Sequence, residues 1–442
     1  MGAEQEHIVL SHMTAFRYWR LASAGLIAMP TRCRVNDLSQ ATSTLRNINP
    51  AHLAWRTITP AVLTEHGIVP RSALEPGLRL LASRGAIPAF KDLASAVDPS
   101  ADTARCRRSI LHELVRLLWS KTDSGLIGLQ TAPERPDFSY SFPLPLDVLL
   151  GERGARCPSS TIRPHCHRQP LPRGALWRIN QSVLIVSPAF LVAQLAGQCV
   201  GQPHIVIAGG VELAGTYSLL PPGYVDCGKL IDEGRDFIAK DGTLLGDGYA
   251  HSQPVLNPSL LSAALTPGCA GYSTAKAAGP YIISGSASPF ETDTHTSLSP
   301  RYPLGGFSAG IPALNTPVHL SPEAQALYDN KQTCVPDALY SGRGRQRVDV
   351  EPGGDVWHGS SWKQDNKRRQ ALERDGYDVV AVSWDEFADF SRWSLIAESI
   401  VARLRFSREP PSTRNREKQA LVHADLVNPD LLRDSFGLPA EE

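Results

Sequence analysis

The chain has 442 residues with 44 basic and 44 acidic side chains, so it offers no global charge to a nucleic acid, and any such binding requires a local patch. A hydrophobic content of 42% is enough for ordinary cores, and the length predicts two or three domains. No apolar run approaches the roughly 20 residues of a membrane span and the first residues lack a signal-peptide pattern, so we expect a cytoplasmic protein with no membrane partner.

The N-terminal half predicts an α+β region. Residues 8–10 form a short apolar strand or helix lead, and Ser11 can cap a helix that buries Ala15, Phe16 and Trp19 on one face. Short and amphipathic helices are expected at residues 75–83 and 110–119. Residues 177–186 are expected to form one strand, after which Ser187 and a proline open a helix.

Eight cysteines are scattered without CxxC pairs, so we expect them to be reduced rather than to form a disulfide framework. One cluster, Cys157, His165, Cys166 and His167, could be tested for zinc. The adjacent histidines and cysteine lack the spacing of a structural zinc site, which makes a zinc module the weakest of three functional hypotheses.

Residues 336–384 predict strand, turn, strand, polar loop, helix and strand. Val348 and Val350 alternate with polar neighbours, as in a half-buried strand that ends near Glu351. Residues 364–375 are rich in helix formers and Gly376 follows as a stop, while residues 377–383 are β-branched enough for a buried strand. A helix is also predicted over residues 389–404, and residues 407–418 are expected to be a polar linker.

Acidic residues and a histidine fall where the chain leaves these elements, at Asp337, Glu351, Asp355, His358 and Asp365. Mg²⁺ prefers a few carboxylates plus waters, and it can polarise a phosphate and lower the pKa of an attacking water. A histidine can act as general acid or base near neutral pH. Each acid also has a structural explanation, since Asp favours turns and a charge at a strand end is readily solvated.

The ordered pattern is Asp337, a strand ending in Glu351, G-G-D-x-x-H, and D-x-x-R-R-x-x-L-x-x-x-G-Y-x-V-V. It resembles nuclease-like domains related to very-short-patch-repair endonucleases, which belong to the PD-(D/E)XK superfamily. The resemblance covers roughly residues 275 to 405. It implies that Asp337 and Glu351 bind Mg²⁺ and that His358 and Asp365 also act in catalysis.

Upstream of this pattern, Ser288-Pro289-Phe290-Glu291 and the later Leu314-Asn315 also resemble the start of such domains. The resemblance implies Glu291 as a weaker metal ligand, although Ser288-x-x-Glu291 is also a helix capping box that needs no catalytic role. Asp355 is the remaining metal candidate, because it could substitute from the loop.

The chain departs from the pattern at Gly353. Two residues after the glutamate the superfamily usually has Lys, or in this branch a polar or acidic residue, and a glycine can neither bind a metal nor orient a water. We therefore carry an inactive nuclease fold as the alternative to an active enzyme.

A run of cations in the predicted helix could contact a nucleic-acid backbone: Lys363, Lys367, Arg368 and Arg369. The same run is typical of a solvated helix face, on which Asp365 and Arg369 would pair at i, i+4.

The N-terminal segment around Ser11 and the later serine–proline helix weakly resemble abortive-infection antitoxins of the AbiEi type. The two resemblances imply a bacterial defence- or repair-related protein that binds DNA, and a possible partner protein through its N-terminal region. The leading hypothesis is Mg²⁺-dependent phosphodiester hydrolysis on DNA. The alternative is a non-catalytic, antitoxin-like or DNA-binding regulator.

The fold expected is α/β, with a restriction-endonuclease-like α/β/α core on a mixed sheet after an α+β N-terminal region. The expected division is an N-terminal region at 1–217, a Gly/Pro-rich connection at 218–280, the nuclease-like domain at 281–405, and a polar linker and tail at 406–442.

Overall fold

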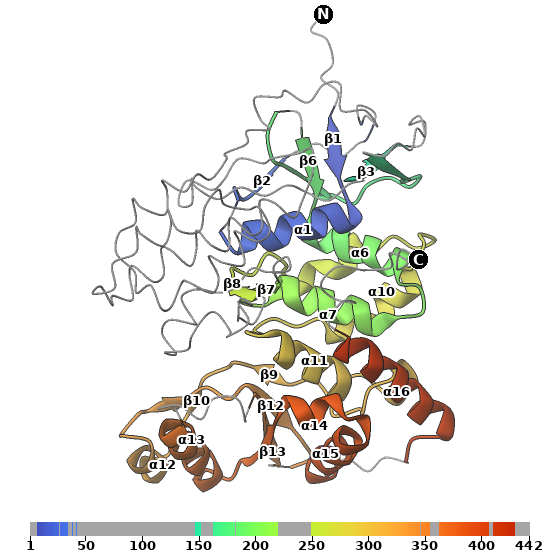
Figure 1. Cartoon of the computed structure of the whole chain (residues 1–442). Helices are drawn as coiled ribbons and strands as arrows, with labels where there is room; N and C mark the ends of the chain where they lie inside the picture. The colour runs from blue at the N-terminus through green and yellow to red at the C-terminus, as the bar shows by residue number, and fades with distance from the viewer. Residues whose placement is uncertain are drawn as a thin grey trace, which may run out of the picture. The chain divides into compact units, whose positions relative to one another are not determined.

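The structure is a computed structural model (Figure 1) that describes residues 7–25, 27–33, 38, 41, 146–151, 162–181, 183–219, 249–344, 346–353, 362–405 and 410–428. The helices expected at 75–83 and 110–119 lie outside the described residues. The chain forms two compact units, one from residues 1–191 and 218–253 and the other from residues 192–217 and 254–442. The two units do not follow the domain boundaries expected at residues 217 and 280. Residues 192–217 and 254–280 pack with the C-terminal part of the chain.

The first unit contains a six-stranded mixed sheet and the helix α1 (His12–Ser23). The central strand β1 is parallel to β6 and antiparallel to β3. Phe16 and Trp19 of α1 are fully buried, and the Trp19 indole donates a hydrogen bond to the Val186 carbonyl at 2.9 Å. In sheet order the strands are β2 (Thr31–Arg32), β5 (Leu176–Arg178), β6 (Val183–Val186), β1 (Ile8–Leu10), β3 (Leu146–Leu150) and β4 (Ile162–Cys166).

The single strand expected over residues 177–186 was wrong, because the chain turns back on itself there as an antiparallel hairpin of β5 and β6. The side chain of Asn180 accepts a hydrogen bond from the Val183 amide at 2.9 Å, and the Ile179 amide donates to the Val183 carbonyl. Asn readily forms such turns with its own side chain, so no Gly or Pro is needed.

Several helices and a two-stranded sheet lie between β6 and α11 in the chain. The helix predicted after Ser187 is confirmed as α6, which begins at a proline. The elements between β6 and α11 are α6 (Pro188–Gln198), α7 (Pro203–Ala214), β7 (Tyr217–Leu219) paired with β8 (Tyr249–His251), the 3₁₀ turn η2 (Pro258–Leu260), α9 (Leu261–Ala264), α10 (Tyr272–Ala278) and the 3₁₀ turn η3 (Gly279–Tyr281).

The second unit is built on a four-stranded mixed sheet in the order β14-β13-β12-β9. The predicted strand, strand, helix, strand order is confirmed, with β12 antiparallel to β13 and β13 parallel to β14. The remaining elements are α11 (Pro289–Leu298), η4 (Tyr302–Leu304), β9 (Ala313–Leu314), β10 (Val318–His319), α12 (Pro322–Leu327), β11 (Thr333–Cys334), β12 (Ala338–Ser341), β13 (Arg347–Pro352), α13 (Trp362–Arg374), β14 (Asp378–Val382), α14 (Trp384–Ala388), α15 (Phe390–Arg403) and α16 (Thr413–Val427).

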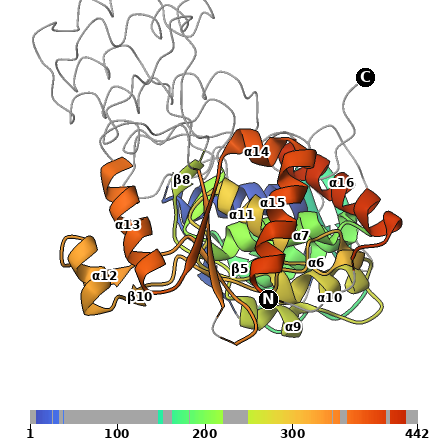
Figure 2. The same ribbon diagram turned by 90° about the horizontal axis from the view of Figure 1, so that it is seen from below.

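Helices cover both faces of this sheet (Figure 2), so the second unit is an α/β layered fold. Val348 and Val350 of β13 face the larger apolar core, which includes Trp393 of α15. The opposite face packs against α12 and α13, through a smaller core that includes Leu372 and Val379. Residues of β13 alternate between these two cores, so its polar positions lie under α13 rather than in open solvent.

Residues 413–427, expected to belong to a polar linker and tail, instead form the helix α16. Ser412 caps it by accepting a hydrogen bond from the Asn415 amide at 3.3 Å. Gln419, Val422 and Leu426 are buried, and their spacing places them on one face of a helix. Most residues of this segment are polar, so the narrow apolar stripe of the helix is hard to recognise in the sequence.

Among the described residues, the helices are too short or too polar to cross a bilayer.

A buried hydrogen-bond network joins α11 to the sheet. His295 is fully buried, and its Nε2 donates to the Tyr281 carbonyl at 2.8 Å, since a carbonyl can only accept. Its Nδ1 therefore accepts from the Ser299 hydroxyl at 2.8 Å, and Ser299 also lies 3.2 Å from the Tyr340 hydroxyl. Burial lowers the pKa of His295 to about 4, although its backbone hydrogen bond opposes the shift.

The lowered pKa of His295 predicts acid sensitivity. The unfolded imidazole takes a proton near pH 6.5 and the folded one only near pH 4, so the neutral histidine stabilises the fold above pH 6.5. The stabilisation is lost as the pH falls through this window, by up to about 3 kcal/mol. Denaturant unfolding of His295→Gln should therefore show a shallower loss of stability than the original protein between pH 6.5 and 4.

His319→Gln provides the control, because His319 is exposed. Equal pH slopes for the original protein and His295→Gln would contradict the assignment.

Candidate functional site

Asp337 and Glu351 lie on neighbouring strands of the second unit. Asp337 directly precedes β12, and Glu351 is close to the end of β13. The register pairs Ala338 with Val350, so Asp337 and Glu351 come next in the ladder, one on each strand. The antiparallel hairpin around residues 341–344 thus brings together two carboxylates that are 14 positions apart in the sequence.

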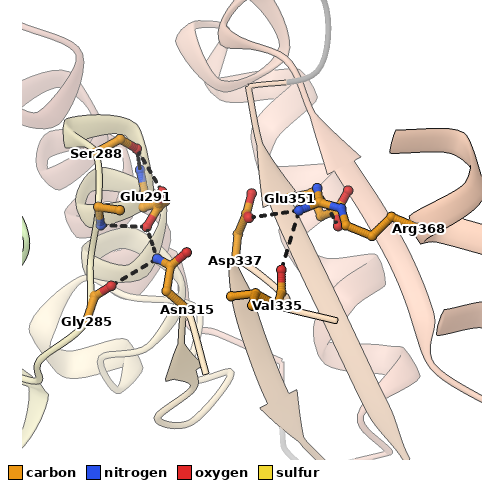
Figure 3. Close-up of polar contacts among 9 residues, drawn as sticks. Gly285, Ser288, Glu291, Asn315, Val335, Asp337, Glu351 and Arg368 are labelled. Atoms are coloured by element: carbon orange, nitrogen blue, oxygen red, sulfur yellow. Dashed lines mark hydrogen bonds and ion pairs between the residues drawn. The ribbon is translucent and has the colours of Figure 1, made fainter. Parts of the chain in front are cut away.

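A guanidinium from α13 connects these two acids (Figure 3). Arg368 Nη2 lies 2.9 Å from Glu351 Oε1, and Nη1 lies 3.7 Å from Asp337 Oδ1. Nη1 also donates to the Val335 carbonyl at 3.4 Å. The three side chains are only 13–22% exposed, so the ion pairs are mostly shielded from water. Arg368 therefore neutralises part of a buried acidic cluster.

A further carboxylate, Asp349, completes the cluster, and sequence reasoning missed it. It is two residues before Glu351 on β13, so the two side chains share a face of the strand. Asp349 is fully buried, and no N–H or hydroxyl of the described residues donates to either of its oxygens. Asp349 lies on the face of the sheet that α13 covers. The alternating pattern of the strand in the sequence predicts that this face is exposed to solvent.

The pKa values of these acids reflect their surroundings. Burial raises the pKa of Asp349 well above its usual range, and the negative charge of Glu351 adds to the rise. Burial also raises the pKa of Asp337 to about 7, an effect that Arg368 opposes and Glu351 enhances. Burial by itself would lower the pKa of Arg368, but the nearby carboxylates outweigh it and raise that pKa. The raised pKa values favour the protonated, neutral form of Asp349 near neutral pH, and they leave Glu351 as the carboxylate that Arg368 contacts most closely.

Glu291 lies near Asp337 through a separate set of contacts (Figure 3). Its Oε2 accepts from the Ala287 amide at 2.8 Å and from Asn315 Nδ2 at 2.6 Å. Ser288 and Glu291 form the expected cap of α11, with the Glu291 amide donating to the Ser288 hydroxyl at 3.2 Å. The charge of Glu291 contributes to the raised pKa of Asp337. The cap by Ser288 is confirmed, whereas the Glu291 carboxylate accepts from the Ala287 amide in place of the Ser288 amide that a capping box uses. A metal-binding role for Glu291 remains a prediction.

Asn315 ties these two groups together, although the sequence assigned it no role. Its side-chain amide donates a hydrogen bond to the Glu291 carboxylate, and its backbone amide donates to the Asp337 carbonyl at 3.0 Å. The backbone of Asn315 is left-handed, with φ of 44°, which Asn tolerates better than most residues. Gly285, whose carbonyl accepts from Asn315 at 2.9 Å, lies so close to β9 that a Cβ would come within 2.7 Å of the Leu314 carbonyl.

Gly353 has a physical reason to be glycine. Its φ is 125°, a conformation that residues with a side chain rarely adopt, and its amide donates to the Val382 carbonyl at 2.9 Å. An acid at this position would strain the backbone even though the space is open. Asp355 and His358 lie outside the described residues, and their roles remain predictions.

Each described cation of the predicted basic run contacts a carboxylate. Lys367 lies 2.6 Å from Asp329, and Arg369 pairs with Glu373 at 2.9 Å rather than with Asp365 as expected. Arg369 pairs with Glu373 because its side chain extends toward the C-terminal turn of α13, away from Asp365 in the first turn. Asp365 is exposed in the first turn, where a negative charge favours the helix. The side chain of Lys363 lies outside the description, and nucleic-acid binding by this run stays a prediction.

Among the residues that the structure describes, no three His, Cys, Asp or Glu side chains are arranged ready to hold a metal ion. In the acidic cluster, Arg368 contacts two of the oxygen donors in place of a metal. In the cluster suggested for zinc, His165 and Cys166 are successive residues of β4, so their side chains point to opposite faces. His165 bonds to Asp147 at 2.8 Å, and Cys157 lies outside the described residues.

Comparison with family models, curated proteins and solved structures finds no match to this chain. The site is therefore interpreted from its own geometry.

Removing the arginine should destabilise the second unit, because the carboxylates would be left buried without their cation. For Arg368→Gln we expect a loss of about 2–3 kcal/mol of unfolding free energy at pH 8, discounted for partial exposure. The loss should be smaller at pH 5, where the carboxyl groups can take up protons. Denaturant unfolding at the two pH values measures both effects.

The matched control is Arg369→Gln on the same helix. Its partner Glu373 is 46% exposed, so the change should cost less than about 0.5 kcal/mol. Equal effects of the two substitutions would show that the buried ion pairs have no special weight.

Proposed function

We propose that the second unit carries a site for metal-dependent phosphodiester hydrolysis on DNA, in a restriction-endonuclease-like core. The observation that carries the proposal is the meeting of Asp337 and Glu351 on adjacent strands, beside α13, in surroundings that are mostly shielded from water. Hard oxygen donors of this kind suit Mg²⁺. The β-β-α-β arrangement also supports the resemblance noted in the sequence.

The carboxylates of Asp337 and Glu351 suit a divalent cation chemically, although in the structure they contact the guanidinium of Arg368. Asp337 and Glu351 would hold the ion, and the side chain of Arg368 would have to move away from them. When bound, Mg²⁺ would polarise a phosphate and lower the pKa of a water molecule. Arg368, released from the carboxylates, could donate two parallel hydrogen bonds to a phosphate.

The first unit would recognise DNA or a partner protein, as the weak antitoxin resemblance implies. Its partly exposed Arg163 and His165 lie beside Asp147, at 3.7 and 2.8 Å respectively. These contacts do not identify a ligand, so the role of this unit rests on the resemblance.

The second candidate is a regulator that binds DNA or a partner without hydrolysing a substrate. The contacts of Arg368 favour it, because an internal guanidinium already compensates both predicted metal ligands. The backbone of Gly353 favours it as well, since its conformation disfavours the polar side chain that the resembled superfamily usually carries at this position.

Incubation of the purified protein with plasmid and single-stranded DNA, with Mg²⁺ or Mn²⁺, separates the two candidates. We expect cleavage that EDTA abolishes and that Asp337→Asn and Glu351→Gln each reduce by about a hundredfold or more, since losing a metal ligand costs several kcal/mol of transition-state stabilisation. Asp329→Asn, which removes an exposed acid paired with Lys367, should cleave normally.

DNA binding without cleavage at any metal concentration would leave the regulator. Cleavage that persists in both variants would exclude this site as its source.

A further inference from the structure

Arginine side chains gather at one end of the four-stranded sheet of the second unit. Arg343 lies in the turn between β12 and β13, Arg403 ends α15, and Arg405 follows just after that helix. The Arg343 amide donates to the Leu404 carbonyl at 3.0 Å, so these two segments touch although they are far apart in the sequence. We call Arg343, Arg403 and Arg405 the arginine patch.

The arginine patch lies at the opposite end of β12 and β13 from the acidic cluster. Asp337 precedes β12 and Glu351 is near the end of β13, whereas the turn that carries Arg343 joins the other ends of these strands. Glu351 is four positions from Arg347, the first residue of β13, which is about 13 Å at roughly 3.3 Å per residue. A ligand of the patch therefore need not contact the candidate metal ligands.

The patch carries positive charge without a counter-ion. Its three arginines are exposed, and in the part of the chain that the structure describes no carboxylate lies within ion-pair distance of them. By contrast, Arg392 and Arg416 of the same unit each contact a carboxylate, at 3.7 and 3.0 Å. Like charges that gather without counter-ions repel one another, and a bound polyanion would relieve this repulsion.

A structural role explains only part of this arrangement. Arg403 occupies the last turn of α15, where a positive charge favours the helix, and Arg347 beside the patch lies over the Tyr377 ring at 4.1 Å. Neither explanation applies to Arg343, which lies in a hairpin turn, or to Arg405, which follows the helix in a left-handed conformation with φ of 53°. Their convergence from two separate segments therefore points to a ligand.

The chemistry of the patch suits phosphate groups better than a folded protein partner. A guanidinium can donate two parallel hydrogen bonds to a phosphate, and several exposed positive charges match the repeating negative charge of a nucleic-acid backbone. Protein interfaces instead depend on aromatic and apolar anchors that become buried. Among the described residues, none of the large exposed hydrophobic side chains belongs to the β12–β13 turn or to the last turn of α15.

We propose that the arginine patch binds the phosphate backbone of a nucleic acid without reading its sequence. The chain has equal numbers of acidic and basic side chains, so such binding requires a local concentration of positive charge, which the patch supplies. The inference goes beyond the proposed hydrolysis and does not depend on it, because the patch is separate from Asp337 and Glu351 and requires no metal ion.

Fluorescence anisotropy of labelled duplex DNA of arbitrary sequence, titrated with the full-length protein in EDTA, tests the proposal without cleavage. For the double variant Arg343→Gln/Arg405→Gln we expect the dissociation constant to rise about tenfold or more at low salt, because two charged phosphate contacts are lost. The slope of log K against log salt, between about 50 and 200 mM, should become shallower by roughly 2. Titration of single-stranded RNA shows which nucleic acid binds more tightly, and the double variant should weaken both.

The matched control is Arg392→Gln/Arg416→Gln, which removes the same charge from two exposed ion pairs of the unit. It should change the dissociation constant by less than about twofold. Circular dichroism and denaturant unfolding establish that both double variants are folded. Equal losses of affinity in the two double variants, an unchanged dissociation constant for Arg343→Gln/Arg405→Gln, or no nucleic-acid binding by the original protein would overturn the proposal.

Competition with poly-glutamate distinguishes phosphate recognition from attraction to any polyanion. We expect poly-glutamate to displace the DNA far less well than unlabelled DNA of equal total charge, because a carboxylate chain lacks the phosphate geometry. Equal displacement would contradict the proposal and indicate an acidic protein as the ligand. Binding through the patch without cleavage in Mg²⁺ would support this inference while contradicting the proposed hydrolysis, so the two can fail separately.

Discussion

Carboxylates buried on one side of a sheet repel one another and lose their hydration, and the second unit can keep them ionised only with a compensating cation. In the structure that cation is the guanidinium of Arg368, which contacts Glu351 and Asp337. The contact joins α13 to the sheet and raises the pKa of Arg368, and it opposes the rise that burial causes in the pKa of Asp337. A metal ion and a guanidinium would compensate the same charges, so binding one should release the other.

The scaffold around this cluster explains how distant residues meet. The β12–β13 hairpin aligns Asp337 with Glu351, and Asn315 fixes Glu291 to the backbone of Asp337. On the other face, Trp393 and the valines of β13 form a separate apolar core, which keeps the sheet rigid beneath the polar side. The candidate site therefore shares the α13 face with the smaller apolar core, whereas the larger apolar core lies on the opposite face of the same strands.

The sequence predicted the order of elements in the second unit because the signals there are local: alternating valines, helix formers ended by Gly376, and a β-branched strand. It missed Asp349, since a polar residue between Val348 and Val350 is expected to face solvent, and only the tertiary packing of α13 covers that face. It also missed the hairpin at Asn180 and the buried stripe of α16, because a side-chain turn and a narrow apolar face leave little trace in composition. The pairing of Arg368 with the acids was hidden because sequence spacing does not show which residue of a helix points at a strand.

The central claim is that the acids around Arg368 form a divalent-cation site. Anomalous X-ray scattering from crystals grown with Mn²⁺ tests it most directly. The account predicts a single strong peak bonded to oxygens of Asp337 and Glu351, with the Arg368 side chain displaced from them. An empty cluster in which Arg368 still contacts Glu351 and Asp337, at Mn²⁺ concentrations that support binding elsewhere, would contradict it.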